Sequence, residues 1–239
     1  MTPVFKGAVP VPNVSLRGNM KINLPPRANE MIASLYEGTR LSAMATAGME
    51  TKKMVSQELM DEMAESARGA GAARAFEKQA RAIAKLMRDR SAYSVGFADV
   101  GGWDTHVNQG SAEGALATNL AGLAGGLAAF AQEMGALWKS TVVLVMSEFG
   151  RTFRENGNRG TDHGHGNTLW VLGGGIAGGR IAGRQAAVDP SNLFQDRDFR
   201  VLNDYRSVLA YVFSRMYGLN GTALDRVLPG VQAGDYSFI

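Results

Sequence analysis

The chain of 239 residues contains no cysteine and only three histidines. The lack of cysteine excludes disulfide bonds, thiolate nucleophiles and zinc sites with cysteine ligands, although it does not identify the cellular compartment. No apolar run approaches the roughly 20 residues that a transmembrane helix needs. The first residues also lack the apolar core of a signal peptide. We therefore expect a soluble chain with no membrane span and no export signal of its own.

The charge of the chain is nearly balanced. Lys and Arg number 25 and Asp and Glu number 22, so the formal net charge is +3. No basic stripe interleaved with aromatic residues is present, and so small a net charge does not call for a nucleic-acid partner. The hydrophobic fraction of 45% is ordinary for a protein that buries a core. These features predict a globular protein that does not bind nucleic acid.

Three segments of the chain differ in composition. Residues 1–26 contain five of the seven prolines, which fix φ and remove amide donors, so this segment is expected to be an extended arm. Residues 27–90 are rich in Ala, Met, Glu, Lys and Arg, with apolar residues at helical spacing, which predicts a helical segment. Residues 91–239 alternate between strand-like and helix-like patterns and form the expected α/β core. We expect residues 27–239 to fold as one domain.

The core region begins with patterns typical of a βαβ unit. Residues 93–98 are short, apolar and partly β-branched, which predicts a strand. Residues 114–138 carry apolar side chains at steps of three and four, which predicts an amphipathic helix. Residues 141–146 form a nearly continuous apolar run, typical of a strand buried on both faces of a largely parallel sheet. The predicted fold class is therefore α/β, with a mixed, mostly parallel sheet flanked by helices.

Two further elements follow a polar, glycine-rich loop at 147–167. A short strand is predicted at 168–172. If this strand pairs antiparallel with the strand at 141–146, its start lies beside the end of the other. Asp204 is expected to cap a helix that ends at Gly218.

Residues that can hold a metal gather in three loops next to the predicted strands. Open α/β sheets bind ligands at the carboxyl ends of their strands, where the first two loops begin, and the third loop joins them under the antiparallel pairing. The predicted ligands are Asp104 and His106 in the first loop, Glu148 in the second, and His163 and His165 in the third. Mixed imidazole and carboxylate ligands suit Zn, Mn or Fe, and the carboxylates also admit Ca. Such a site can activate a bound water or polarise a substrate oxygen, as a metal-assisted hydrolase requires.

Each of these residues also has a simpler interpretation. A histidine in a loop is usually an exposed or hydrogen-bonded side chain. Asp104 and Asp162 are equally typical of turns, which Asp favours. Glu148 either binds the metal, caps the helix that follows it, or pairs with Arg151. The metal site and these structural roles both remain open at this point.

Other polar residues in the loops are candidates for the surroundings of the metal or for substrate binding. Arg151 is expected to bind a phosphate or sulfate, because a guanidinium meets such oxyanions with two hydrogen bonds. Asp162 is expected to support a neighbouring ligand. Asn108 and Gln109 either orient a ligand or merely start the next helix. Arg154 and Arg159 are interpreted as a solvated face of the same loop.

Three motifs, in this order, resemble the domain of unknown function 1501 family. They are Gly102-Trp103-Asp104-Thr105-His106, Met146-Ser147-Glu148-Phe149-Gly150-Arg151-Thr152 and Gly160-Thr161-Asp162-His163-Gly164. The tail is also similar, through Asn203-Asp204-Tyr205-Arg206 and Leu228-Pro229-Gly230. The resemblance covers essentially the whole chain. It implies an alkaline-phosphatase-like or sulfatase-like fold with a two-metal site for phosphate or sulfate esters.

The resemblance also implies roles for individual residues. Asp104 and His106 match an Asp and a His that hold one metal, and His163 or His165 would complete that site. Members of this superfamily usually begin with a strand that ends in a further metal-binding Asp, followed by the nucleophile. The chain matches the region after these residues. The resemblance therefore implies the C-terminal portion of a longer protein, incomplete at its N-terminus.

Two functions follow from this resemblance. The first is a metal-dependent hydrolase-like domain that acts on a small phosphate or sulfate ester and lacks its nucleophile in this fragment. The second is a non-catalytic binding or scaffold domain with a vestigial metal site. Glu148-Phe149 stands where the superfamily usually has an Asp-His pair for the second metal, and this departure speaks for the second function. Family members commonly carry an export signal, which implies a bacterial periplasmic protein.

Overall fold

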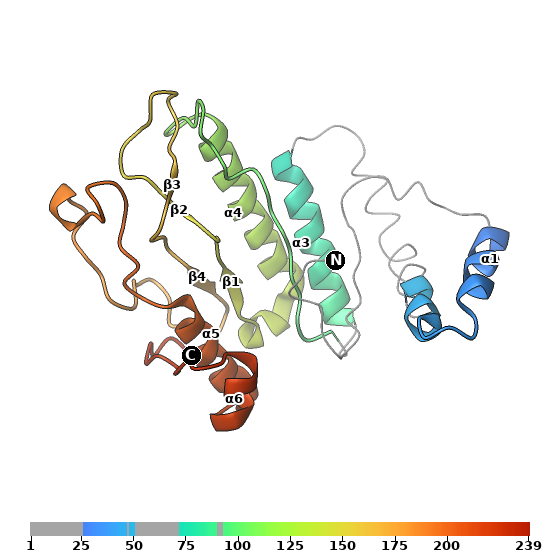
Figure 1. The fold of residues 1–239 in the computed structure, drawn as a ribbon. Helices are drawn as coiled ribbons and strands as arrows, with labels where there is room; N and C mark the ends of the chain where they lie inside the picture. Colours follow the sequence, from blue (N-terminus) through green and yellow to red (C-terminus); the bar gives the residue numbers. More distant parts are fainter. Residues whose placement is uncertain (1–25, 47, 51–71, 90–92) are drawn as a thin grey trace.

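The structure is a computed structural model that describes residues 26–46, 48–50, 72–89 and 93–239 (Figure 1). The predicted arm at 1–26 lies outside this part of the chain, apart from its last residue. Within the predicted helical segment, the described residues are largely helical. The segment contains α1 (Pro26–Tyr36), helical turns at 42–46 and 48–50, and α3 (Ala72–Asp89).

The long predicted helix at 114–138 is confirmed and packs against α3. Helix α4 (Ala115–Met134) buries one face through Gly122, Leu123, Gly126, Ala129 and Met134. It then tightens into a 3₁₀ turn, η2 (Gly135–Ser140), at Gly135, whose φ is +54°. Figure 1 shows α3 and α4 side by side. A hydrogen-bonded ion pair between Arg88 and Glu133 joins their ends.

The contact between these two helices depends on one glycine. A Cβ atom at Gly126 would lie 2.2 Å from Cδ1 of Phe76 on α3, so only glycine allows this approach. By length and composition alone, the stretch Ala115–Ser140 is also apolar enough to cross a membrane. Such a stretch is weak evidence for a membrane span, because the core helix of a soluble protein meets the same criterion.

Two small antiparallel sheets carry the strands. The strand β1 (Val143–Val145) pairs with β4 (Trp170–Leu172), with Val145 opposite Trp170. The strand β2 (Gly150–Arg151) pairs with β3 (His163–Gly164), with Arg151 opposite His163. The antiparallel pairing that would bring the three loops together, between the strands near 141–146 and 168–172, is thus present. The general α/β class holds as well, because the described chain combines helices with small antiparallel strands.

The expected mostly parallel sheet is not found among the described residues, where both ladders are antiparallel. The strand predicted at 93–98 is also wrong, because this segment forms no ladder. Its alternating apolar side chains point partly into solvent, since Val95 is 69% exposed. Its Gly96 lies against Ile83 and Met87 of α3. The segment therefore packs on a helix and pairs with no strand, so the predicted βαβ unit does not form.

The C-terminal part covers one face of the β1–β4 sheet. Helix α5 (Tyr205–Tyr217) begins at Asp204, whose carboxylate accepts a hydrogen bond from the Arg206 amide, and ends at Gly218 in the left-handed conformation. This confirms the predicted cap and stop. The short helix α6 (Gly221–Val227) follows. A core of Tyr211, Val212 and Phe238 packs against apolar side chains of the sheet, including Leu144 and Val171.

The α3–α4 contact predicts that replacing two neighbouring glycines by alanine changes the free energy of unfolding in opposite directions. Gly126→Ala forces a methyl group into Phe76 and is expected to lower the free energy of unfolding by about 1–3 kcal/mol. Gly125→Ala is the matched control, because nothing lies within 4 Å of its added Cβ. Its better helix propensity is expected to raise the free energy of unfolding by up to about 1 kcal/mol. Urea unfolding followed by circular dichroism measures both, and equal effects of the two substitutions would contradict this packing.

Candidate metal centre

The candidate site forms where the loop at 101–110 meets the hairpin that contains β2 and β3. Two backbone hydrogen bonds join the segments, from Asn108 N to Asn158 O (3.0 Å) and from Gln109 N to Arg159 O (2.8 Å). A Cβ atom at Gly160 would lie 2.3 Å from the carbonyl carbon of His106. Glycine at position 160 therefore lets the hairpin backbone lie directly on the loop backbone. This contact brings side chains from both segments together.

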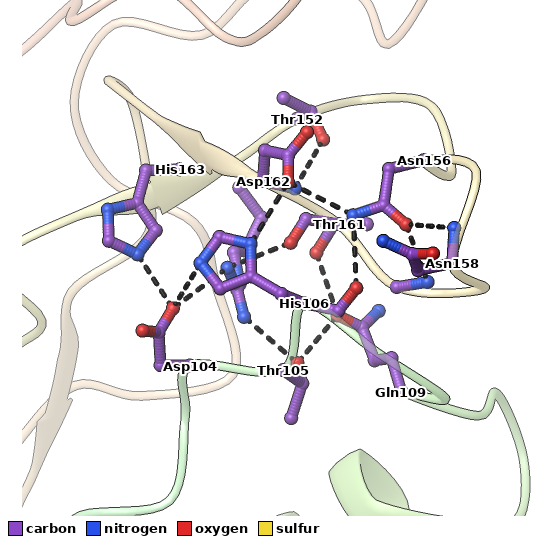
Figure 2. A network of polar contacts seen from close by, with 12 residues as sticks. Asp104, Thr105, His106, Gln109, Thr152, Asn156, Asn158, Thr161, Asp162 and His163 are labelled. Carbon is purple, nitrogen blue, oxygen red and sulfur yellow. Dashed lines mark hydrogen bonds and ion pairs between the residues drawn. The ribbon is translucent and has the colours of Figure 1, made fainter.

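Asp104, His106 and His163 form a group of potential metal ligands. Their ligand atoms all lie within 4.8 Å of one another. Asp104 Oδ1 is 2.9 Å from His106 Nε2 and 2.7 Å from His163 Nε2. Figure 2 shows the two rings converging on this carboxylate. The side chains are 58%, 40% and 52% exposed, so the group is open to solvent.

Asp162 contacts the ring nitrogen of His106 that does not face Asp104. Its Oδ1 lies 2.9 Å from His106 Nδ1 (Figure 2). An ionised carboxylate can only accept, so His106 Nδ1 carries a proton and donates it. The Nε2 atom of the same ring faces Asp104. A histidine that binds a metal through one nitrogen almost always donates its other N–H to such a partner.

Hydrogen bonds to the two aspartates favour their ionised forms. The hydrogen bond from the His163 ring holds the pKa of Asp104 below its ordinary value, and the nearby His106 and Arg151 lower it further. The hydrogen bond from the Asn156 amide lowers the pKa of Asp162, and the His106 ring adds to this effect. Both groups are therefore carboxylates at neutral pH, the form in which they bind metals or support histidine ligands.

Arg151 holds the loop instead of presenting its guanidinium to solvent. Its Nη2 donates to the Trp103 carbonyl (2.9 Å) and to Thr105 Oγ1 (3.0 Å). Its Nη1 donates to the Thr161 carbonyl (3.0 Å) and lies 3.4 Å from Asp104 Oδ1. The side chain is only 22% exposed. The predicted capture of an oxyanion by Arg151 stays a prediction, and in this structure its donors bind the protein.

A buried polar contact beside the site uses Gln109, one of the two neighbouring residues that the sequence indicated, and not Asn108. Gln109 Oε1 accepts hydrogen bonds from Thr105 Oγ1 and Thr161 Oγ1, both at 2.7 Å. Thr105 is 9% exposed, so this contact is largely shielded from water. Asn108 is exposed and occupies the left-handed region, with φ +47°. Its backbone shapes the turn that docks on the hairpin.

Asn156 is a member of this network that the sequence did not single out. Its Nδ2 lies 3.0 Å from both the His106 carbonyl oxygen and Asp162 Oδ1. Its Oδ1 accepts from the backbone amides of Asn158 (2.9 Å) and Gly160 (3.1 Å). The only local signal was an Asn in a turn ahead of a glycine, a residue type that commonly bonds its own backbone.

His165 belongs to a separate pair. Its Nδ1 lies 2.8 Å from Asp198 Oδ2, which also accepts a hydrogen bond from the His165 amide. The Asp198 side chain is fully buried, while that of His165 is 54% exposed. Burial raises the pKa of Asp198, but the hydrogen bonds from His165 outweigh it, so the pKa lies below its ordinary value. His165 thus presents only its Nε2 to solvent, outside the group formed by Asp104, His106 and His163.

Glu148 and Phe149 take different positions at the edge of the site. Glu148 is exposed and is not part of the group of ligand atoms found among the described residues. Phe149 stacks on the His163 ring, with centroids 4.3 Å apart and an interplanar angle of 15°. Three of the five predicted ligands therefore come together, and the other two lie outside this group.

A family model described as "Protein of unknown function (DUF1501)" matches residues 14–228. The chain belongs to the DUF1501 family. No curated protein and no solved structure matches the chain. The family match therefore agrees with the three motifs, and it names no activity.

The buried Asp198 carboxylate predicts a pH-dependent contribution to stability. Because its pKa is lowered in the folded protein, this contribution is complete above the ordinary carboxyl pKa of about 4 and is lost as the pH falls through the lowered value. At pH 7, Asp198→Asn is expected to lower the free energy of unfolding by about 1–3 kcal/mol. The loss of stability caused by Asp198→Asn should become smaller as the pH falls towards 2.5. Urea titrations at several pH values measure it.

Asp196→Asn is the matched control for this prediction. Asp196 is 77% exposed and pairs with Arg154 at the surface. Exposed pairs contribute about 0–1 kcal/mol, and Asn tolerates the positive φ of this position. An equal loss in both variants, or a loss at Asp198 that does not depend on pH, would contradict the assigned role.

Proposed function

We propose that the chain is a metal-dependent hydrolase domain and that Asp104, His106 and His163 bind the divalent metal. The observation that carries this proposal is the convergence of three ligand atoms within 4.8 Å. Two imidazoles and one carboxylate are the ligand set that leaves open positions on Zn or Fe(II) for water or substrate. The solvent exposure of the three side chains fits a site that a substrate can reach.

The geometry of the ligands fits a metal with small adjustments. Zn–N and Zn–O bonds of ~2.0–2.1 Å place the ligand atoms of a tetrahedral site about 3.3 Å apart. Asp104 Oδ1 lies 2.9 and 2.7 Å from the two histidine nitrogens. These two pairs would open by a few tenths of an ångström to accept the ion, and the whole group of ligand atoms already lies within 4.8 Å. The Asp162 carboxylate on His106 supplies the outer contact that such a ligand uses.

The proposed reaction is hydrolysis of a phosphate or sulfate ester, the class that the motifs imply by resemblance. A metal at this position would supply Lewis-acid stabilisation of a substrate oxygen. The protein residues would do the rest: His106 and His163 hold the ligand geometry, Asp162 keeps the proton on His106 Nδ1, and Arg151 fixes the loop that carries Asp104. The substrate would approach from the exposed side of the group.

A non-catalytic domain that keeps one structural metal is the second candidate. Phe149 favours it, because the aromatic ring covers one face of His163 where the superfamily usually has a second pair of ligands. The exposed Glu148 is consistent with a single metal. The two candidates share the same first metal and differ in turnover.

Single substitutions should separate ligands from bystanders. His106→Ala and His163→Ala are each expected to weaken Zn²⁺ binding by more than about 100-fold, because changes in the outer contacts alone already cost 10–100-fold. His165→Ala is the matched control and should bind Zn²⁺ within about threefold of the wild type. Elemental analysis of protein purified without chelator and calorimetric titration of Zn²⁺, Mn²⁺ and Ca²⁺ measure these effects. Unchanged metal content in the His106→Ala, His163→Ala double variant would exclude the site.

Turnover distinguishes the hydrolase from the scaffold. Because the resemblance implies a nucleophile ahead of the matched region, the metal-loaded protein is assayed in its longest natural form with aryl phosphate and aryl sulfate esters, alongside His106→Ala. Hydrolysis that is lost in the variant supports the hydrolase. Metal bound at the group without hydrolysis of either ester favours the structural metal.

A further inference from the structure

We infer that Asn156 is a positioning residue that sets the orientation of His106 at the metal through Asp162. This inference rests on the proposed metal site and adds a residue that lies outside the ligand group and touches none of its metal-facing atoms. Asn156 comes from the hairpin, whereas His106 comes from the loop 50 residues earlier. One amide therefore links the two halves of the site.

The Asn156 side chain uses its full hydrogen-bonding capacity. A primary amide has two N–H donors and two acceptor positions. The acceptor side binds the backbone amides of Asn158 and Gly160 and so shapes the turn. The donor side reaches the His106 carbonyl and Asp162 Oδ1, both at 3.0 Å. Figure 2 shows Asn156 between the turn and these two groups.

The two donated hydrogen bonds act on the same ligand residue. One holds the backbone of His106 directly. The other holds Asp162 Oδ1, the oxygen that also accepts from His106 Nδ1 at 2.9 Å. The single Asn156 amide thus holds the His106 backbone directly and the His106 ring through Asp162. The direction of His106 Nε2 towards Asp104 and His163 follows from these two contacts.

The substitution Asn156→Asp separates the two sides of the amide. Aspartate keeps an oxygen for the Asn158 and Gly160 amides, so the turn retains its acceptor. It loses both donated hydrogen bonds and adds a negative charge near the site. The charge alone would strengthen the binding of a cation, whereas loss of positioning weakens it. The sign of the change in metal affinity therefore decides between the two effects.

The test is a calorimetric titration of the full chain with Zn²⁺. Asn156→Asp is expected to bind about 10–100-fold more weakly than the wild type, the usual effect of an outer contact. Asn158→Asp is the matched control, because it makes the same charge change on an exposed residue of the same turn. This control should bind Zn²⁺ as tightly as the wild type or more tightly. Wild-type affinity in Asn156→Asp would overturn the inference.

A double-mutant cycle tests whether Asn156 acts through Asp162. Asp162→Asn should also weaken Zn²⁺ binding, and the loss in the double variant should be smaller than the product of the two single losses, because both residues share the hydrogen bond at Asp162 Oδ1. If the two losses of Zn²⁺ affinity multiply in the double variant, Asn156 does not act through Asp162. If Asn156→Asp does not fold, Asn156→Ser replaces it with the same expected loss.

Nuclear magnetic resonance of the zinc-loaded chain gives a second readout. With three histidines, the ring N–H signals can be assigned by substitution. The His106 Nδ1 proton should exchange with water faster in Asn156→Asp than in the wild type or in Asn158→Asp. An unchanged exchange rate would count against the positioning role. Wild-type protein that binds no Zn²⁺ would refute the metal site itself, whereas binding lost in His106→Ala but kept in Asn156→Asp would refute only the role of Asn156.

Discussion

The close backbone contact between Gly160 and His106 is the constraint on which the site depends. Any side chain at position 160 would collide with the His106 carbonyl, and the docking of loop on hairpin would open. The loop supplies Asp104 and the hairpin supplies His163, so neither segment holds the ligand group alone. The hydrogen bonds of Arg151 and Gln109 then fasten a contact that the glycine makes possible.

Features with short-range signals were predictable from the sequence. The cap at Asp204 and the stop at Gly218 depend on residues within one helix, and both are confirmed. The apolar period of residues 114–138 likewise predicts α4 itself, although only Leu123 and Met134 of the apolar stripe are buried. The motif around Asp104 and His106 predicts ligands because polar residues of these types share a glycine-flanked loop. The antiparallel pairing of β1 and β4 entered only as the condition for bringing the three loops together, and the structure contains it.

Features that depend on distant partners were not predictable. Residues 93–98 have a strand-like pattern, yet Gly96 packs on α3 and no strand lies in register with the segment. His163 and His165 are equivalent in sequence, and only the position of Asp198, 33 residues further on, assigns His165 to another partner. The sequence around Asn156 indicates only an ordinary turn residue, because its contacts with the loop at 101–110 are tertiary. In each case the local sequence is compatible with more than one role, and a tertiary contact determines which role the residue takes.

The separation of the ligands along the chain has a consequence for folding. Asp104 and His163 are 59 residues apart, so the unfolded chain must close a long loop before both can hold one ion. An ion with affinity only for the folded state stabilises it by about 2.7 kcal/mol at 100 times its dissociation constant. Metal in this site would therefore act as a removable cross-link between the loop and the hairpin. The chain would gain or lose that cross-link with the supply of metal around it.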